Sequence, residues 1–190
     1  MREWERYRRN KMDGFVKALE KGEIDEDIVE LLNLINSLEG YVTLSSCSGR
    51  IAVIDLPETG DKKSSIFLGK WHREVNGEEV IRAALESKSF AWLIQYPPIL
   101  HVACRTLHHA EELVKIANNA GFRRSGVISL KNCVVEISSL ERVELPLAVS
   151  GKLIAPEDYV NIAVKFANAK LRRGKDKLER LKEELRTFSG

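Results

Sequence analysis

The 190-residue sequence lacks three motifs that mark familiar nucleotide and metal sites: Gly-x-Gly, Gly-Lys-Ser/Thr and His-Glu-x-x-His. Their absence excludes the usual phosphate loop of Rossmann folds, the P-loop, and the helical zinc site of metalloproteases. Histidine and cysteine side chains still offer metal-ligand atoms, but their spacings match no strong zinc pattern, so we expect no metal site. The side chains concerned are Cys47, His72, His101 and Cys104.

Cysteine itself is scarce. Three cysteines without a close pair argue against a disulfide scaffold and indicate a reducing compartment, so we expect a cytoplasmic protein. No apolar run reaches the ~20 residues of a membrane span. The charged start, Met1–Trp4, lacks the apolar core of a secretion signal. The sequence therefore predicts no membrane partner.

A strong charge imbalance is also absent. The formal net charge of +2 neither demands nor excludes a nucleic-acid partner. Hydrophobic residues make up 44% and charged residues 31%, which is typical of a globular chain, and the length suits one domain over residues 1–190. A single glutamine, Gln95, in a chain rich in lysine and glutamate indicates a thermophilic source.

Hydrophobic periodicity divides the chain into helices and strands. Apolar residues at helical spacing predict helices over Trp4–Ala18, Asp25–Leu38, Glu78–Ser87, His108–Asn119 and Glu157–Phe188. Short apolar runs bounded by turn residues predict strands over Tyr41–Ser46, Arg50–Leu56, Ser64–Trp71, Phe90–Tyr96, Ile99–Arg105, Val127–Leu130, Cys133–Ile137 and Arg142–Leu147. A turn containing Pro57 and Gly60-Asp61 is expected before the third strand.

The order helix, strand, strand, strand occurs twice. Gly40-Tyr41 and Gly121-Phe122 precede the two sets of strands, and at the same offset Arg50–Asp55 aligns with Lys131–Glu136. The predicted fold class is α+β and not Rossmann. Two related helix–three-strand halves would form a mixed or antiparallel sheet or a barrel-like core, with extra N- and C-terminal helices. Chance similarity between two hairpins is the alternative.

The stretch Ser45–Arg50 (Ser-Ser-Cys-Ser-Gly-Arg) places small polar side chains between two apolar runs. Serine and glycine are common in turns, so the ordinary interpretation is a hairpin turn. Three hydroxyls, the adaptable backbone of Gly49 and the fork of donors on Arg50 also suit a site for a carboxylate or phosphate.

Other polar residues lie at the expected ends of strands. Trp71 beside His72 offers a stacking plane and a titratable nitrogen, although a tryptophan that covers the edge of the core is the ordinary interpretation. His101 lies in an apolar run, where a buried structural histidine is the commoner outcome. The last helix carries nine basic and four acidic residues between Lys165 and Arg186. A solvated face with a docking stripe, a dimer contact and an RNA contact each explain this pattern.

Together these motifs resemble the archaeal tRNA wybutosine-synthesizing protein 3 family over nearly the whole chain. The most specific match is Ser45–Ile51. Further matches are Lys70–His72, Ile99–Val102, Ala120–Arg123, Ser125–Gly126, Glu144–Leu147 and Ala167–Asn168. The chain departs from the family pattern at Tyr96, where an acid is frequent, and at Ile137–Leu140, where Arg-Ser-Thr is frequent.

The resemblance implies a methyltransferase that uses S-adenosyl-L-methionine and acts on tRNA(Phe). Its target would be ring nitrogen N4 of the tricyclic 7-aminocarboxypropyl-demethylwyosine base that follows the anticodon, a step of wyosine and wybutosine biosynthesis. The fold would be the family's own α+β arrangement. A non-catalytic RNA- or nucleotide-binding module and a structural oligomer built through the C-terminal helix are the alternatives, and the oligomeric state stays open.

The same resemblance suggests a hypothesis for the site. Serines would face the cofactor or the amino-acid chain of the base, Arg50 would grip a carboxylate, and a histidine would accept the proton released from nitrogen. The residues expected to bind the cofactor are Ser45, Ser46, Ser48, Trp71, Ser125 and Gly126. Those expected in catalysis are His72, His101 and Arg50. Those expected to contact RNA phosphates are Arg6, Arg9, Lys170, Arg172 and Arg173.

Overall fold

The computed structural model describes residues 2–57 and 65–188. Its helices are α1 (Arg2–Glu20), α2 (Val29–Ser37), α3 (Gly77–Leu85), α4 (Leu107–Asn119) and α5 (Glu157–Phe188), with a 3-10 turn η1 (Glu26–Ile28). Its strands are β1 (Tyr41–Cys47), β2 (Arg50–Leu56), β3 (Ile66–Trp71), β4 (Phe90–Tyr96), β5 (Ile99–Cys104), β6 (Gly126–Ser129), β7 (Val134–Ile137), β8 (Val143–Val149) and β9 (Lys152–Leu153). The expected turn at Gly60-Asp61 and the expected strand start at Ser64 lie outside the described residues.

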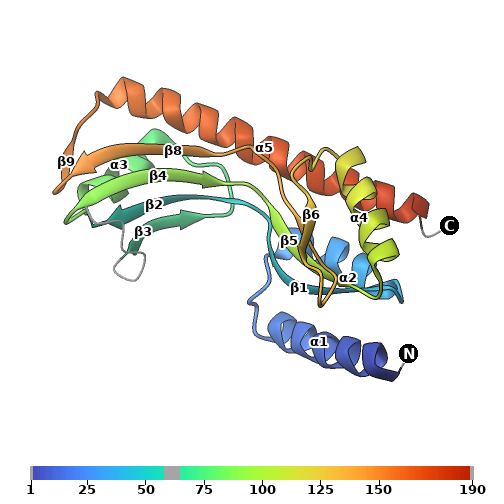
Figure 1. Ribbon diagram of the computed structural model, residues 1–190. Helices are drawn as coiled ribbons and strands as arrows, with labels where there is room; N and C mark the ends of the chain where they lie inside the picture. Colours follow the sequence, from blue (N-terminus) through green and yellow to red (C-terminus); the bar gives the residue numbers. More distant parts are fainter. Residues whose placement is uncertain (1, 58–64, 189–190) are drawn as a thin grey trace. The chain divides into compact units, whose positions relative to one another are not determined.

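The strands form two antiparallel sheets, so the α+β prediction is confirmed. One sheet has the order β1-β5-β7-β6 and the other β3-β2-β4-β8-β9 (Figure 1). Neither sheet closes on itself, and the barrel-like alternative is therefore wrong. Among the described helices, none has the length and apolar character that crossing a bilayer requires.

The chain divides into two compact units. The first contains residues 1–48, 98–140 and 175–190, and the second contains residues 49–97 and 141–174. The first unit thus holds the four-stranded sheet, and the second unit holds the five-stranded sheet. The predicted C-terminal helix over 157–188 is confirmed with those bounds, and its residues are shared between the units. A single domain over 1–190 stays a prediction.

The core of the first unit lies between one face of its sheet and helices α2, α4 and the end of α5. The predicted apolar face of α2 is buried there, as are Leu113 and Ala117 of α4. Leu178, Leu181 and Leu185 of α5 join the same core. The apolar stripe predicted near the C-terminus therefore packs on its own chain.

The opposite face of this sheet is covered by α1. A small apolar cluster of Val42, Ala103 and Val134 packs against Trp4 and Tyr7. Because side chains alternate along a strand, His101, two positions before Ala103, and Glu136, two positions after Val134, lie on the same face. Both of these residues are polar.

The core of the second unit lies between its sheet and helices α3 and α5. Ile51, Val53 and Leu93 of the sheet contact Val80 of α3 and Val164 of α5. A capping box fixes the start of α3: the Asn76 side chain accepts from the Glu79 backbone N–H, and the Glu79 carboxylate accepts from that of Asn76, both at 2.9 Å. In Figure 1 the strands of this sheet run side by side along the start of α5.

Two expectations about strand pairing are corrected by the topology. Ser45–Arg50 is not a hairpin turn, because β1 pairs with β5 while β2 pairs with β3 and β4. The aligned segments Arg50–Asp55 and Lys131–Glu136 lie in different sheets, and the second begins as a turn that enters β7 only at Val134. The two halves of the sequence thus contribute strands to both sheets and do not build equivalent layers.

Candidate active site

A row of polar residues crosses three strands of the first unit's sheet. Ser45 of β1 is paired with His101 of β5, and His101 is paired with Glu136 of β7. Ser45 Oγ lies 2.8 Å from His101 Nδ1, and His101 Nε2 lies 3.0 Å from Glu136 Oε2. The structure therefore places a hydroxyl, an imidazole and a carboxylate in one hydrogen-bonded series.

A shift of register in β1 creates this series. The pairing with β5 is regular up to Thr43, then shifts so that Ser45 and not Leu44 lies opposite His101. Such a bulge turns a side chain to the other face of a strand. Without it, Leu44 would stand beside His101 and Ser45 would point to the core.

The hydrogen bonds define the state of the imidazole. An ionised Glu136 can only accept, so His101 Nε2 carries hydrogen and, in the neutral ring, Nδ1 accepts from the Ser45 hydroxyl. The second oxygen of Glu136 accepts from Ser138 Oγ at 3.2 Å, which holds the carboxylate in place. The side chains of His101 and Glu136 are 26% and 32% exposed. This arrangement can move a proton at Nδ1 in a site open to a ligand.

Gly126 continues the row on β6, opposite Glu136. A Cβ at Gly126 would meet no atom within 4 Å, so the space beside this position is open. Ser125 has a structural contact: its hydroxyl donates to the Phe122 carbonyl at 2.8 Å and accepts from the Ser138 backbone at 3.4 Å. The strand pairing thus places Ser45, His101, Glu136 and Gly126 in one row across the sheet, while the roles expected for Ser45, His101 and Gly126 stay predictions.

Ser48 ties the end of the motif to the rest of the first unit. It is fully buried, and its backbone N–H donates to Asp25 Oδ2 at 2.7 Å. Its hydroxyl accepts from Lys175 Nζ of α5 at 3.3 Å, and Lys175 also pairs with Asp27. Gly49 follows with a φ of 90°, a conformation that glycine adopts without strain. Ser48 therefore orders the loop, and a direct cofactor contact stays a prediction.

A cavity of about 440 Å³ lies beside Ser45 and Ser46 in the first unit. Its apolar lining includes Phe15 and Leu32, and its polar lining includes Lys11 and Glu23. The volume falls within the 300–1,000 Å³ range of small-molecule sites, and the mixed lining suits a ligand with a ring and a charged end.

Arg50 in the second unit contacts an aromatic ring. Its guanidinium carbon lies 5.6 Å from the centre of the Tyr96 ring, and that of Arg142 lies 5.1 Å from the same ring. Burial raises the pKa of Tyr96, so the ring stays neutral. Arg142 pairs with Glu144 at 2.8 Å, whereas the buried Nε of Arg50 makes no hydrogen bond. Arg50 thus keeps a donor for an anion.

Trp71 is the last residue of β3 in the second unit, His72 follows it, and both are partly buried. The Trp71 ring lies over Gly69: a Cβ there would be 2.1 Å from Cη2 of the tryptophan. The ring also packs against the unit's core. The packing interpretation of Trp71 therefore accounts for its position, and stacking on a ligand stays a prediction.

The five basic residues expected at RNA differ in their surroundings. Arg6 and Arg9 are exposed on α1, and Arg173 is exposed on α5. Lys170 donates to the Arg142 carbonyl at 3.0 Å, and Arg172 pairs with Glu74 at 2.5 Å. These last two are therefore partly engaged within the second unit.

Glu136 is the residue that inference from the sequence missed. The available signal was an acid inside the apolar strand Val134–Ile137, where a partly buried carboxylate is stabilised by a partner. Its partner, His101, is 35 residues away in the sequence. Only strand pairing brings the two together.

The fold and the site define an α+β protein outside the Rossmann class, with a histidine–carboxylate pair that can handle a proton. A family model described as Methyltransferase TYW3 matches residues 4–187. The chain belongs to the methyltransferase TYW3 family.

Named relatives agree with this assignment. A protein of Archaeoglobus fulgidus, 57% identical over 97% of this chain and 94% of its own length, is named tRNA(Phe) 7-((3-amino-3-carboxypropyl)-4-demethylwyosine(37)-N(4))-methyltransferase. A protein of Thermococcus kodakarensis is 48% identical over 92% of this chain and 89% of its own length. It has the same name, followed by the number 1. The solved structure of the PH1069 protein from Pyrococcus horikoshii has a TM-score of 0.91 at 44% identity, and 95% of each chain is covered.

Proposed function

We propose that this protein transfers a methyl group from S-adenosyl-L-methionine to N4 of the 7-aminocarboxypropyl-demethylwyosine base in tRNA(Phe). The observation that carries the proposal is the 57% identity, over 97% of the chain, to the Archaeoglobus fulgidus protein named for this reaction. The series Ser45–His101–Glu136 supports it chemically, because methylating a ring N–H requires a proton acceptor.

When bound, S-adenosyl-L-methionine supplies a methyl group on a positively charged sulfur. In the reaction a bond forms between N4 and the methyl carbon, the sulfur–carbon bond breaks, and the proton of N4 leaves. We assign the proton to His101 Nδ1 by way of Ser45: the Ser45 hydroxyl passes its own proton to Nδ1, 2.8 Å away, and Oγ takes the proton of N4. Glu136 keeps Nε2 protonated and stabilises the imidazolium that forms. His72 is the other candidate base from the sequence and serves as the comparison variant.

The cavity beside Ser45 and Ser46 fits the proposed cofactor. Its apolar residues can pack on the adenosyl group, and Lys11 and Glu23 carry the charges that complement an amino acid's carboxylate and ammonium. Arg50, with its unbonded Nε, is the corresponding carboxylate or phosphate ligand in the second unit. Arg50→Ala should reduce single-turnover methyl transfer by orders of magnitude while leaving unfolding unchanged.

The RNA partner is proposed to contact the basic residues of α1 and α5. Reversing the charges of Lys170, Arg172 and Arg173 should weaken tRNA binding and reduce the slope of log affinity against log salt. An affinity that does not change with salt would oppose this part of the proposal.

The deciding experiment is incubation with methyl-labelled S-adenosyl-L-methionine and tRNA(Phe) that carries the unmethylated tricyclic base. Label should enter that base, and not tRNA(Phe) with an unmodified guanine at the same position. Calorimetry separates the alternatives: a non-catalytic RNA-binding module would bind tRNA without binding the cofactor, and a structural oligomer would bind neither.

A further inference from the structure

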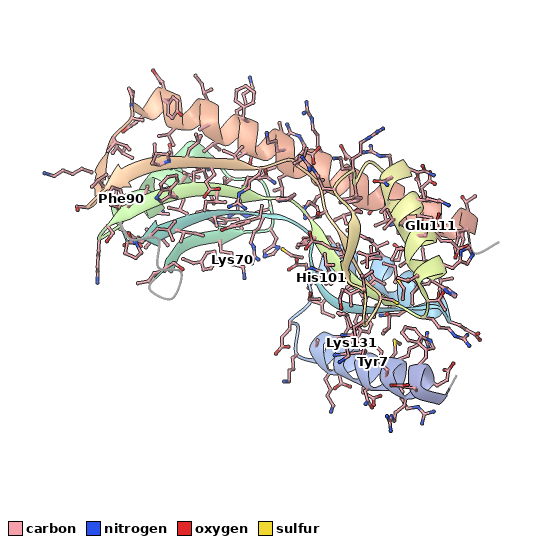
Figure 2. The ribbon with its side chains drawn as sticks, in the orientation of Figure 1. Tyr7, Lys70, Phe90, His101, Glu111 and Lys131 are labelled. Carbon is pink, nitrogen blue, oxygen red and sulfur yellow. The ribbon has the colours of Figure 1, made fainter. Side chains whose placement is uncertain are left out.

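A second cavity of the first unit lies near the N-terminal end of α1. It has a volume of about 380 Å³, and its lining includes Trp4, Tyr7, Arg105, Lys131, Asn132 and Cys133. Figure 2 shows Tyr7 and Lys131 next to each other where α1 meets the sheet. The proposed methyl transfer uses none of these side chains.

Two aromatic rings form one wall of this cavity. Trp4 and Tyr7 stack on each other with ring centres 5.9 Å apart and planes inclined by 28°. Trp4 Nε1 donates to the Glu39 carbonyl at 3.1 Å, which fixes the indole. Both side chains are only partly buried, so ring surface remains for a ligand. Aromatic walls of this kind bind nucleobases by stacking.

The charged side chains that line the cavity are two cations, Arg105 and Lys131, and one carboxylate, Glu3. Within residues 2–57 and 65–188, no carboxylate pairs with the Arg105 guanidinium or the Lys131 ammonium. Some other lysines of this unit, such as Lys115, which lies 2.9 Å from Glu111, do have an acidic partner. Two unpaired cations beside stacked rings suit a phosphate attached to a base.

The backbone around these side chains is held in place. Arg105 N donates to the Gly40 carbonyl at 2.8 Å, and Cys104 N donates to the Cys133 carbonyl at 2.9 Å. Cys133 has a φ of 47°, which lets the turn fold back onto β5. The cavity is thus built by three elements before any ligand arrives, and this lowers the entropy lost on binding.

We infer that this cavity binds one unstacked nucleotide of an RNA chain, with the base against Trp4 and Tyr7 and the phosphate between Arg105 and Lys131. A free nucleotide offers the same base and phosphate groups. An RNA chain is favoured because Arg105 follows the end of β5, four residues after His101, which is about 13 Å at the rise of a strand. A few nucleotides of one strand can span that distance. The inference rests on the proposed function, since it takes RNA as the substrate.

The test measures binding and not methylation. The probe is a stem–loop RNA with the anticodon-loop sequence of tRNA(Phe), together with versions that each lack one loop base but keep its ribose and phosphate. In the wild type, loss of one particular base should weaken binding between about 5-fold and 100-fold. In Tyr7→Leu the same loss should have almost no further effect, because the stacking surface has gone.

The cations are tested with a matched control. Lys131→Gln should weaken binding of every probe by a similar factor and lower the salt slope by about one. Lys115→Gln removes the same charge from α4, where Lys115 is paired with Glu111, and should leave both quantities unchanged. If Lys131→Gln and Lys115→Gln behave alike, the cavity does not bind phosphate.

Alkylation of Cys133 separates RNA from a free nucleotide. Cys47 and Cys104 are buried, so iodoacetamide should react first with Cys133 in the cavity. Slower alkylation with the stem–loop but not with adenosine monophosphate supports the inference. Protection by adenosine monophosphate alone, or an equal effect of base loss in wild type and Tyr7→Leu, overturns it. Either result leaves the methyl-transfer proposal standing, because label incorporation into tRNA(Phe) is measured separately.

Discussion

Replacing Glu136 by glutamine tests whether the carboxylate assists the chemistry through His101. The amide oxygen can still accept from His101 Nε2, so Glu136→Gln removes the charge while keeping the hydrogen bond. Folding should therefore change little, and the effect on methyl transfer should report on the charge.

The size of the effect follows from the geometry. At 3.0 Å and an effective dielectric constant of about 20, an imidazolium and a carboxylate attract by about 5.5 kcal/mol. Both side chains are more than a quarter exposed, so screening and desolvation remove much of this. The net value for a hydrogen bond to a charged group, about 1.5–3 kcal/mol, is the better guide. It corresponds to a loss of about 10- to 100-fold in rate.

The assay is single-turnover methyl transfer to tRNA(Phe) with enzyme in excess, so that product release does not contribute. His101→Ala should lose about 10²- to 10⁴-fold. Adding Glu136→Gln to it should lose little more, because the charge acts through the ring. Glu112→Gln is the matched control, since it removes the same charge from another histidine–glutamate pair, in which Glu112 lies 3.5 Å from His108 on α4. A wild-type rate for Glu136→Gln, or a full additional loss in the double variant, would refute this reasoning.

Three other predictions concern stability and are measured by urea unfolding. Gln95 is fully buried with neither amide atom hydrogen-bonded, so Gln95→Met should raise the free energy of unfolding by about 1–3 kcal/mol; a decrease would show that the amide has a partner. Asn168 donates to the Val75 carbonyl at 2.8 Å and accepts from its N–H at 3.1 Å, so Asn168→Ala should destabilise by about 2–3 kcal/mol, and no change would contradict the double hydrogen bond. Burial raises the pKa of the Cys104 thiol from its ordinary 9.0 to about 12. Between these values the unfolded state binds fewer protons, so stability should fall from about pH 9 to 12, and less so in Cys104→Ala; equal slopes would contradict this.

Strand positions were predictable where burial is continuous. β2 (Arg50–Leu56) and β4 (Phe90–Tyr96) have the predicted bounds, because both are central strands whose side chains are buried on both faces. β6 (Gly126–Ser129) begins and ends one residue earlier than predicted, because its side chains are partly or fully exposed and the apolar pattern is weak there. β7 (Val134–Ile137) begins one residue later than predicted, because Cys133 belongs to the preceding turn, with a φ of 47°. The short β9 (Lys152–Leu153) was missed because two residues give no periodicity.

Strand partners were not predictable in the same way. Local turn chemistry at Ser45–Arg50 favours a hairpin, yet β1 and β2 belong to different sheets. The position of each strand is decided by its hydrogen-bonded partner strand, which can be distant in the sequence. β1 pairs with β5, whose residues lie more than 50 positions further along the chain. The free energy of such a pairing depends on contacts that no short window of sequence contains.

The bulge at Leu44 lets β1 bury an apolar side chain and present a hydroxyl to His101 on the same face of the sheet. A regular strand from Tyr41 would alternate core and α1 faces, so that Leu44 faces α1 and Ser45 the core. A serine in that core would lose its hydrogen bond to His101 at a cost of about 1–3 kcal/mol. With one extra residue, Leu44 keeps its contacts in the cluster under α1, and Ser45 also reaches that face, opposite His101. The small polar motif is therefore less a turn than the end of a strand whose register is shifted by one residue. That shift is what joins a hydroxyl on β1 to the histidine–carboxylate pair of β5 and β7.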